Sequence, residues 1–451
     1  MDVCALVRDM TQGNPVSVLI RFTIPVVLGN LFQQAYNIAD SVVVGNFVGA
    51  EALAAVGASS PIVYLFVAIA VGGSLGSSVV IGQLFGAQDY KRTKTAVYTA
   101  MITITAISVL LTVLGLIING PILRLLNTPA DVIDLAATYL GIYFIGLIFL
   151  FLYNINTAVF NALGDSRTPL YLLIFSSLLN IGLDLLFVTR FHLGVAGVAW
   201  ATLIAQALAA VLSTLLLMRR LRDIRAEEAV ARFDFGLLRG MAKVAVPSML
   251  QQSIVSLGTV SIQSVVNGFG TTVLAGFTAA GKIESIALMP IVNVGNSVAN
   301  FVAQNIGARK IERIKSGFIG GLGMIAVLSI VITGAIYLWG DVFVGGFLDS
   351  EANREILEFG VSYLRIISLF FILFGAMNVV TGVIKGSGDM GVFMLATLTN
   401  FVIRIAACFT LNTVIGPAIL WWSAPAGWAA CGIIQAIRYF TGGWKKRALA
   451  E

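Results

Sequence analysis

The stretch QLFGAQDYKRTK, residues 83–94, returns in the second half of the chain as QNIGARKIERIK, residues 304–315. Both copies keep a glycine at the same place, Gly86 in the first and Gly307 in the second. Copies this far apart are not neighbouring units of a solenoid, and they divide the 451 residues into two halves. Other positions recur at nearly the same distance: Pro25 with Pro247, Gly49 with Gly270, Leu53 with Leu274, Arg92 with Arg313 and Lys94 with Lys315.

Long apolar runs surround both copies of this stretch. Hydrophobic residues make up 58% of the chain and charged residues only 11%, whereas soluble domains carry roughly 25% charged residues. About 20 apolar residues span a bilayer as a helix, and barrel strands would instead be short and alternating. The sequence therefore predicts an all-α membrane protein with twelve transmembrane helices in two pseudo-symmetric six-helix lobes.

The expected domain organisation follows from the repeat. Residues 1–220 form an N-lobe with spans one to six, 221–243 form a basic cytoplasmic linker, and 244–451 form a C-lobe with spans seven to twelve. Glycines at 72, 73 and 76 predict close helix packing. The last span, within 414–437, contains two prolines, and the sequence does not settle how it is built.

The basic residues predict the orientation of the chain. The net charge of +6 comes from short segments between apolar runs, so it reflects the positive-inside rule and does not indicate nucleic-acid binding. Both termini are therefore expected in the cytoplasm. The basic residues on that side are Lys91, Arg92, Lys94, Arg167, Arg219, Arg220, Arg222, Arg225, Arg232, Arg239, Arg309, Lys310, Arg313, Lys315, Lys385, Lys445, Lys446 and Arg447, against Arg124, Arg190 and Arg354 on the other.

Asp40 lies inside the first apolar run, in NLFQQAYNIADSVVVG. A carboxylate at the centre of a bilayer costs about 2.5–3.5 kcal/mol on insertion scales, so it is expected to have a function. Helical spacing places Tyr36 and Asn37 on the face of Asp40. Pro25, about four turns earlier, removes a backbone hydrogen bond and can bend the helix.

A second carboxylate, Asp184, lies in the fifth span with Asn180 one turn before it. Asn154 in span four and Thr202 in span six are further polar candidates. Two carboxylates confined in one lobe share protons, and amide and hydroxyl oxygens beside them can replace water around Na+. The alternative is that such groups only join helices by hydrogen bonds of about 0.6 kcal/mol each. We expect a coupling-ion site with Asp40, Asn180 and Asp184 as candidate Na+ ligands.

The second half lacks this acidic pair. The segment Asn180…Asp184 aligns with Asn400…Arg404, and the counterpart of Asp40 falls near Ser261, so the ion chemistry is expected to be asymmetric. Charges in or near the spans of this half are candidates for substrate contact or for structural pairing, with Glu284 and Arg404 as one expected pair. They are Glu284, Arg404, Lys282 and Arg365.

Together with NALGDSRTP at 161–169 and LLNIGLDLLF around Asp184, these features resemble the MATE family of multidrug and toxic compound extrusion transporters. The resemblance implies a V-shaped bundle of two lobes and export of cationic or amphipathic compounds by alternating access, driven by entry of H+ or Na+. It assigns Asp40, Asn180 and Asp184 to the N-lobe cation site, with Asn154 and Thr202 as helpers. Span seven, PSMLQQSIVSLGTVSIQSVV, has no acid, so the resemblance is to the branch with an N-lobe Asp pair.

Two other classes of function remain as alternatives. A lipid-linked precursor flippase of the same superfamily could use basic residues of the second half to contact lipid phosphates. A membrane-embedded enzyme would need convergent catalytic groups, which the single histidine and the missing nucleotide, metal and hydrolase motifs do not provide, so we expect no enzymatic activity and no cofactor beyond the coupling ion. The expected partners are small organic substrates and the lipid bilayer, and the protein is expected to be a monomer in a bacterial inner membrane.

Overall fold

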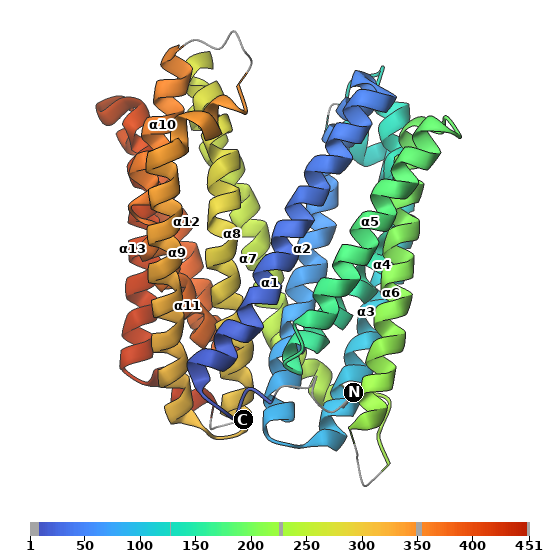
Figure 1. Ribbon diagram of the computed structural model, residues 1–451, viewed down its shortest axis with the longest axis vertical. Coiled ribbons are helices and arrows are strands. Elements are labelled where there is room, and N and C mark those ends of the chain that lie inside the picture. The colour runs from blue at the N-terminus through green and yellow to red at the C-terminus, as the bar shows by residue number, and fades with distance from the viewer. Residues whose placement is uncertain (1–8, 127, 225–228, 349–353, 449–451) are drawn as a thin grey trace. The chain divides into compact units, whose positions relative to one another are not determined.

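The computed structural model describes residues 9–126, 128–224, 229–348 and 354–448, and helices make up nearly all of them (Figure 1). The described residues divide into two compact units. Unit 1 comprises residues 28–249 and unit 2 comprises residues 9–27 together with those from 250 onward. The predicted all-helical architecture in two lobes is therefore confirmed.

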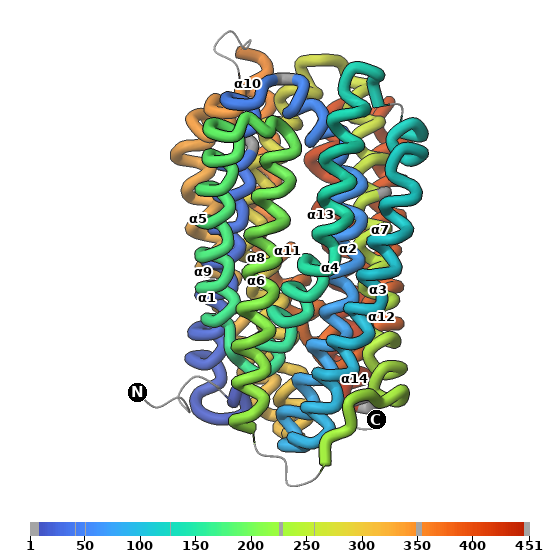
Figure 2. The backbone as a smooth tube through the Cα atoms, turned by 90° about the vertical axis from the view of Figure 1, so that its right-hand side faces the viewer, coloured from blue at the N-terminus to red at the C-terminus, as the bar shows by residue number. Residues whose placement is uncertain are grey.

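Unit 1 is a bundle in which α4 packs against three helices, α2, α3 and α6, and α5 runs beside α6 (Figure 2). Its apolar core includes the buried rings of Phe144, Phe151 and Phe160 on α4. A Cβ atom at Gly76 would lie 2.7 Å from the Ala245 Cβ, so α2 and α7 approach too closely for any larger residue. Its elements are the second part of α1 (Pro15–Val43), the π-helical turn η2 (Val44–Val48), α2 (Ala50–Gly86), α3 (Tyr90–Leu125), α4 (Ile133–Ala162), α5 (Arg167–Thr189), α6 (Gly194–Asp223) and the first part of α7 (Phe235–Gly268).

Unit 2 has the same plan with two irregularities. The helical stretch from Arg354 to Gly386 is divided into two helices, bent by 49° at Leu369 and Phe370. Pro417 lies in a short 3-10 turn and Pro425 lies inside the following helix, which answers how the proline-containing last span is built. The elements are α8 (Thr271–Gly307), α9 (Ile311–Gly345), α10 (Arg354–Ser368), α11 (Phe371–Gly386), α12 (Met390–Ile415), η3 (Gly416–Ala418), α13 (Ile419–Phe440) and α14 (Gly443–Ala448), with the first part of α1 and the last part of α7.

Length and composition identify nine described helical stretches that could cross a membrane, or ten with the bent α10–α11 pair. The number is below the predicted twelve for two reasons. The 51-residue stretch Met390–Phe440, which holds α12 and α13, counts once, and α7 is missing because Gln, Ser and Thr residues interrupt its apolar sequence.

The first part of α1 belongs to unit 2 because the chain ahead of it is bonded to α8 and α9. The Gln304 side chain accepts a hydrogen bond from the Met10 N–H at 2.9 Å. The Arg313 guanidinium donates to the carbonyls of Gln12 and Gly13 at 3.0 and 2.7 Å. We call these contacts the N-terminal clamp. They explain why one unit boundary falls inside α1, after residue 27. The other boundary falls inside α7, after residue 249, and not in the predicted linker 221–243, of which 225–228 lie outside the described residues.

The structure corrects the register between the two halves. Early in each half the spacing of the sequence repeat holds, because Gly49 and Gly270 precede α2 and α8 with left-handed φ values of 114° and 92°. At the turns before α5 and α12 the matching glycines are Gly164 and Gly388, with φ of 81° and 75°. This second pair is a few positions further apart in the sequence than the first. The change arises between the ends of α9 and α11, a segment that contains the α10–α11 break absent from α4.

This register changes the expected counterparts of the acidic cluster. When Gly164 is matched with Gly388, buried residues of α5 fall on buried residues of α12, as Ser177 on Phe401 shows. The alignment of Asn180 and Asp184 with Asn400 and Arg404 was therefore wrong by about one helical turn. Asn180 corresponds to Arg404, and Asp184 corresponds to Cys408.

Candidate functional site

Two carboxylates that are far apart in the sequence come together in unit 1. Asp40 lies in the last turn of α1, and Asp184 lies near the C-terminal end of α5. Their carboxyl groups are within hydrogen-bonding range of each other. Asp184 is completely buried and Asp40 is half-buried. Two carboxylates this close repel each other unless a proton or another cation lies with them.

Asn180 connects the carboxyl pair to its surroundings. In the amide orientation that satisfies both ends of the side chain, its nitrogen donates to Asp184 Oδ2 at 2.9 Å and to the Tyr36 hydroxyl at 3.1 Å. Its oxygen accepts a hydrogen bond from the Thr202 backbone N–H at 3.0 Å. Helices α1, α5 and α6 therefore meet at this one amide, and the predicted residues Tyr36, Asn180 and Thr202 all belong to the cluster.

Each carboxyl group keeps one buried oxygen to which no described group donates a hydrogen bond, Asp40 Oδ1 and Asp184 Oδ1. A buried polar atom without a partner is costly, and an anionic one more so. The donor set is two carboxylates with an amide and a hydroxyl nearby, and hard cations such as Na+ prefer oxygen ligands of this kind. The cluster therefore fits H+, Na+ or both in turn.

Tyr139 on α4 borders the cluster and was missed by the sequence analysis. It lies within electrostatic range of both Asp40 and Asp184. Its ring stacks on that of Tyr143, one turn further along α4, with 6.5 Å between the centroids. The tyrosine pair at i and i+4 in a membrane helix was the available signal, because it places two hydroxyl groups on one helix face.

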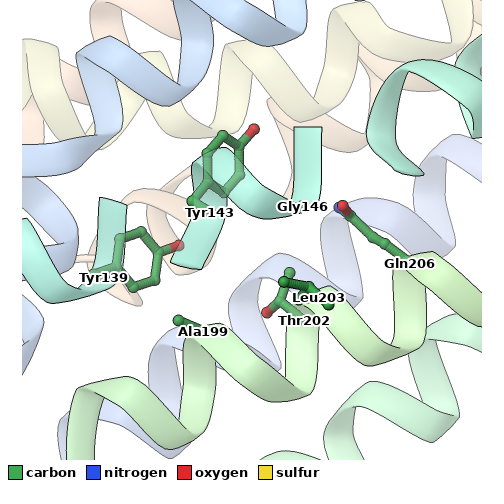
Figure 3. A pocket seen from close by; sticks show the side chains of 7 residues that line it. All are labelled: Tyr139, Tyr143, Gly146, Ala199, Thr202, Leu203 and Gln206. Carbon is green, nitrogen blue, oxygen red and sulfur yellow. The ribbon is translucent and has the colours of Figure 1, made fainter. Parts of the chain in front are cut away.

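A small cavity of about 10 Å³ adjoins the cluster between α4 and α6. Figure 3 shows Tyr139 and Tyr143 on one side, with Thr202 and Gln206 on the other. Thr202 borders both this cavity and the Asn180 amide. A cavity of this size has room for about one water molecule, and Thr202, Gln206 and the tyrosine hydroxyls are the polar groups in its lining.

Three other predicted residues of the first half lie in different settings. The Asn154 amide donates to the Leu150 carbonyl of its own helix at 2.8 Å. Asn37 is exposed, and its amide nitrogen lies 3.2 Å from the Gln34 side-chain oxygen. Pro25 is buried within α1, just before the residue at which the helix passes from unit 2 to unit 1.

The four candidate charges of the second half separate into two kinds. Arg365 forms an ion pair with Asp341 at 3.0 Å near the surface, and exposed Lys282 lies over the Phe347 ring. Glu284 and Arg404, both half-buried, lie within electrostatic range of each other in unit 2. Among the described residues there is no direct ion pair between those two. Glu284 instead accepts a 2.7 Å hydrogen bond from the hydroxyl of Tyr363.

Comparisons with known proteins agree with the duplicated helical architecture. The MatE family model matches residues 25–186 and 247–410, once in each half and over more than half of the chain. The chain is 32% identical to a probable multidrug resistance protein, YpnP of Bacillus subtilis (strain 168), over 87% of each protein. It is 29% identical to another from the same organism, YoeA, over 95% of this chain and 94% of that protein. The chain also matches a solved structure, described as the outward-facing conformation of a multidrug resistance MATE family transporter of the MOP superfamily. The TM-score is 0.90 and the sequence identity 22%, over 99% of this chain and 100% of that one. This match concerns the fold alone.

Proposed function

Since this chain belongs to the MatE family of membrane transporters, we propose that it is a multidrug efflux protein that exports cationic or amphipathic organic compounds in exchange for H+ or Na+. Its relatives YpnP and YoeA are both named as probable multidrug resistance proteins, which supports this substrate class. It is a multi-pass membrane protein. By the distribution of its basic residues, both termini face the cytoplasm of a bacterial cell.

The observation that carries the ion-coupling part is the carboxyl pair of Asp40 and Asp184. Both groups belong to membrane helices, and each has a buried oxygen without a described partner. Binding of a cation there would reduce the negative charge of the pair and the repulsion between the two carboxylates, and its release would restore that repulsion. A site whose charge changes in this way can bias a transporter between two conformations, because an ion shifts an equilibrium by its differential affinity for the two states.

The flippase alternative is not favoured. The flippase hypothesis was based on the basic residues in the second half. Two of these lie near the surface of unit 2, where Lys282 lies over the Phe347 ring and Arg365 pairs with Asp341. The named function of the relatives is multidrug resistance.

Transport in proteoliposomes tests the proposal. Purified protein would be reconstituted, and tetraphenylphosphonium movement would be followed under an imposed pH gradient, an imposed Na+ gradient, or neither. We expect transport under at least one gradient and none without a gradient. Equal tetraphenylphosphonium movement in all three conditions would contradict coupled export. The same liposomes loaded with a fluorescent lipid-linked phosphate would show lipid translocation if the protein were a flippase.

A further inference from the structure

The corrected register gives the acidic cluster of unit 1 a counterpart in unit 2 with a different composition. Asp184 corresponds to Cys408, and both side chains are completely buried. Asn180 corresponds to Arg404, so a neutral amide in one unit is replaced by a guanidinium in the other. The equivalent place in unit 2 has therefore lost a carboxylate and gained a fixed positive charge, because arginine stays protonated in proteins.

A carboxylate is nevertheless present at this place, supplied by a different helix. Glu284 on α8 accepts a 2.7 Å hydrogen bond from the hydroxyl of Tyr363 on α10, and the Tyr363 side chain is completely buried. Arg404 lies within electrostatic range of both groups, and Cys408 lies within electrostatic range of Tyr363. The Arg404 Nε atom is buried and has no described hydrogen-bond partner, so this guanidinium is not held by another acid at that atom.

The charge of the two places differs by two, because the place in unit 2 has one carboxyl group fewer and one guanidinium more. The place in unit 1 has two carboxyl groups and no basic side chain of its own, so it becomes neutral only when two monovalent cations, protons included, lie with the pair. The place in unit 2 has one carboxyl group and one guanidinium and is neutral without any bound ion. Removing one partner of a buried charge pair leaves the other uncompensated, which is strongly unfavourable.

We propose that Arg404 is a built-in counter-ion, which does for Glu284 what the coupling cation does for Asp40 and Asp184. Unit 2 then binds no coupling ion, and unit 1 alone determines the number of ions exchanged. The inference rests on the proposed function, because it presumes that the carboxyl pair of unit 1 binds the coupling cation. Arg404 then determines the ion stoichiometry, because it keeps unit 2 from binding a further ion.

The test counts cations bound by purified protein, as protons taken up after a pH jump and as ²²Na+ bound at equilibrium. The parent variant is D40N/D184N, in which the site of unit 1 is silenced. We expect this parent to bind no coupling cation, and addition of Arg404→Asn to create binding of one H+ or Na+ per molecule at Glu284. Further addition of Glu284→Gln should remove that gain. The control Arg404→Lys keeps the charge and should leave the parent stoichiometry unchanged.

Two outcomes would overturn the proposal. One is that Arg404→Asn adds no cation to a parent that remains monodisperse in gel filtration. The other is that Glu284→Gln alone, with Arg404 intact, lowers the number of cations bound, since this would mean that Glu284 already binds one. The second measurement decides the question even if the Arg404→Asn variants do not fold. Equal cation binding by the wild type and by D40N/D184N would instead contradict the proposed function. The effect of Arg404→Asn would still be measured relative to the D40N/D184N parent.

Discussion

At the scale of single residues, Asn180 determines how the carboxyl pair is held. It bonds to Asp184, to the Tyr36 hydroxyl and to the backbone of Thr202, so it fixes the positions of three helices around one anionic site. An amide can donate and accept at the same time, which neither a carboxylate nor a guanidinium can do. Replacement of this residue by Arg404 in unit 2 therefore changes the geometry of the site as well as its charge.

Replacement of Asp40 or Asp184 by asparagine should abolish gradient-driven export and leave the protein folded. The exchange removes the negative charge at nearly constant volume, so helix packing survives while cation binding does not. Export of tetraphenylphosphonium should fall to the level of protein-free liposomes. Asp131→Asn, which changes an exposed carboxylate, is the matched control and should transport normally. Efflux at the wild-type rate by well-folded D40N and D184N variants would show that the pair does not couple transport.

At the scale of the helix, α1 carries Asp40 of the proposed cation site and passes from unit 2 to unit 1. Its first part belongs to unit 2 through the N-terminal clamp, and its second part carries Tyr36 and Asp40 in unit 1. Pro25 lies close to the passage between them and lacks the N–H that would bond to the carbonyl four residues earlier. A change of charge at Asp40 can therefore be transmitted along one continuous helix.

Pro25→Ala should slow export with little effect on ion affinity. Alanine restores one backbone hydrogen bond, worth about 0.5–1.5 kcal/mol, and makes bending of α1 harder by that amount. The rate should fall about two- to tenfold by transition-state arithmetic. Ion binding and export would be measured in the same preparation. Loss of ion affinity in parallel with export would indicate that Pro25 shapes the site itself and not the bending of the helix.

Arg313→Gln should loosen the N-terminal clamp. The guanidinium donates to three carbonyls ahead of α1, and hydrogen bonds from charged groups contribute about 1.5–3 kcal/mol each when well shielded. Because this arginine is half-buried, we expect a loss on the order of 2 kcal/mol in total, seen as a lower melting temperature and faster hydrogen exchange at residues 10–13. Lys315→Gln, an exposed residue of the same helix, is the control. Unchanged exchange at residues 10–13 would mean that the clamp does not hold this segment.

At the scale of the whole molecule, the energy for export has to come from an ion gradient if the proposed function holds. One elementary charge moving down 100 mV yields about 2.3 kcal/mol. A tenfold concentration ratio corresponds to about 1.4 kcal/mol, so one or two ions can sustain a tenfold to thousandfold gradient of substrate. A single cation site in unit 1 is therefore sufficient, and unit 2 does not need to bind an ion.

A steady substrate gradient across proteoliposomes should consequently collapse when the ion gradient is dissipated. An ionophore selective for H+ or for Na+ would be added after substrate has accumulated, and only the one that matches the coupling ion should release it. The extent of accumulation should rise with the imposed gradient up to the limit set by one or two ions. Accumulation that survives both ionophores would contradict ion-driven export.

The sequence by itself determined the helical class and the duplication, because these depend on apolar length and on a repeated pattern. It also singled out Asp40 and Asp184 as the carboxylates of the proposed cation site, because of the cost of placing them in a membrane helix. It could not show that Asp40, Asn180 and Tyr139 meet, since contacts between α1, α4 and α5 join segments far apart in the chain. It also misaligned the second half, because a small shift within apolar helices leaves hydrophobicity almost unchanged. Only the tertiary structure, through the matching turns at Gly164 and Gly388, identified Arg404 as the counterpart of Asn180 in the repeat, because a turn with left-handed φ fixes the register that an apolar helix leaves free.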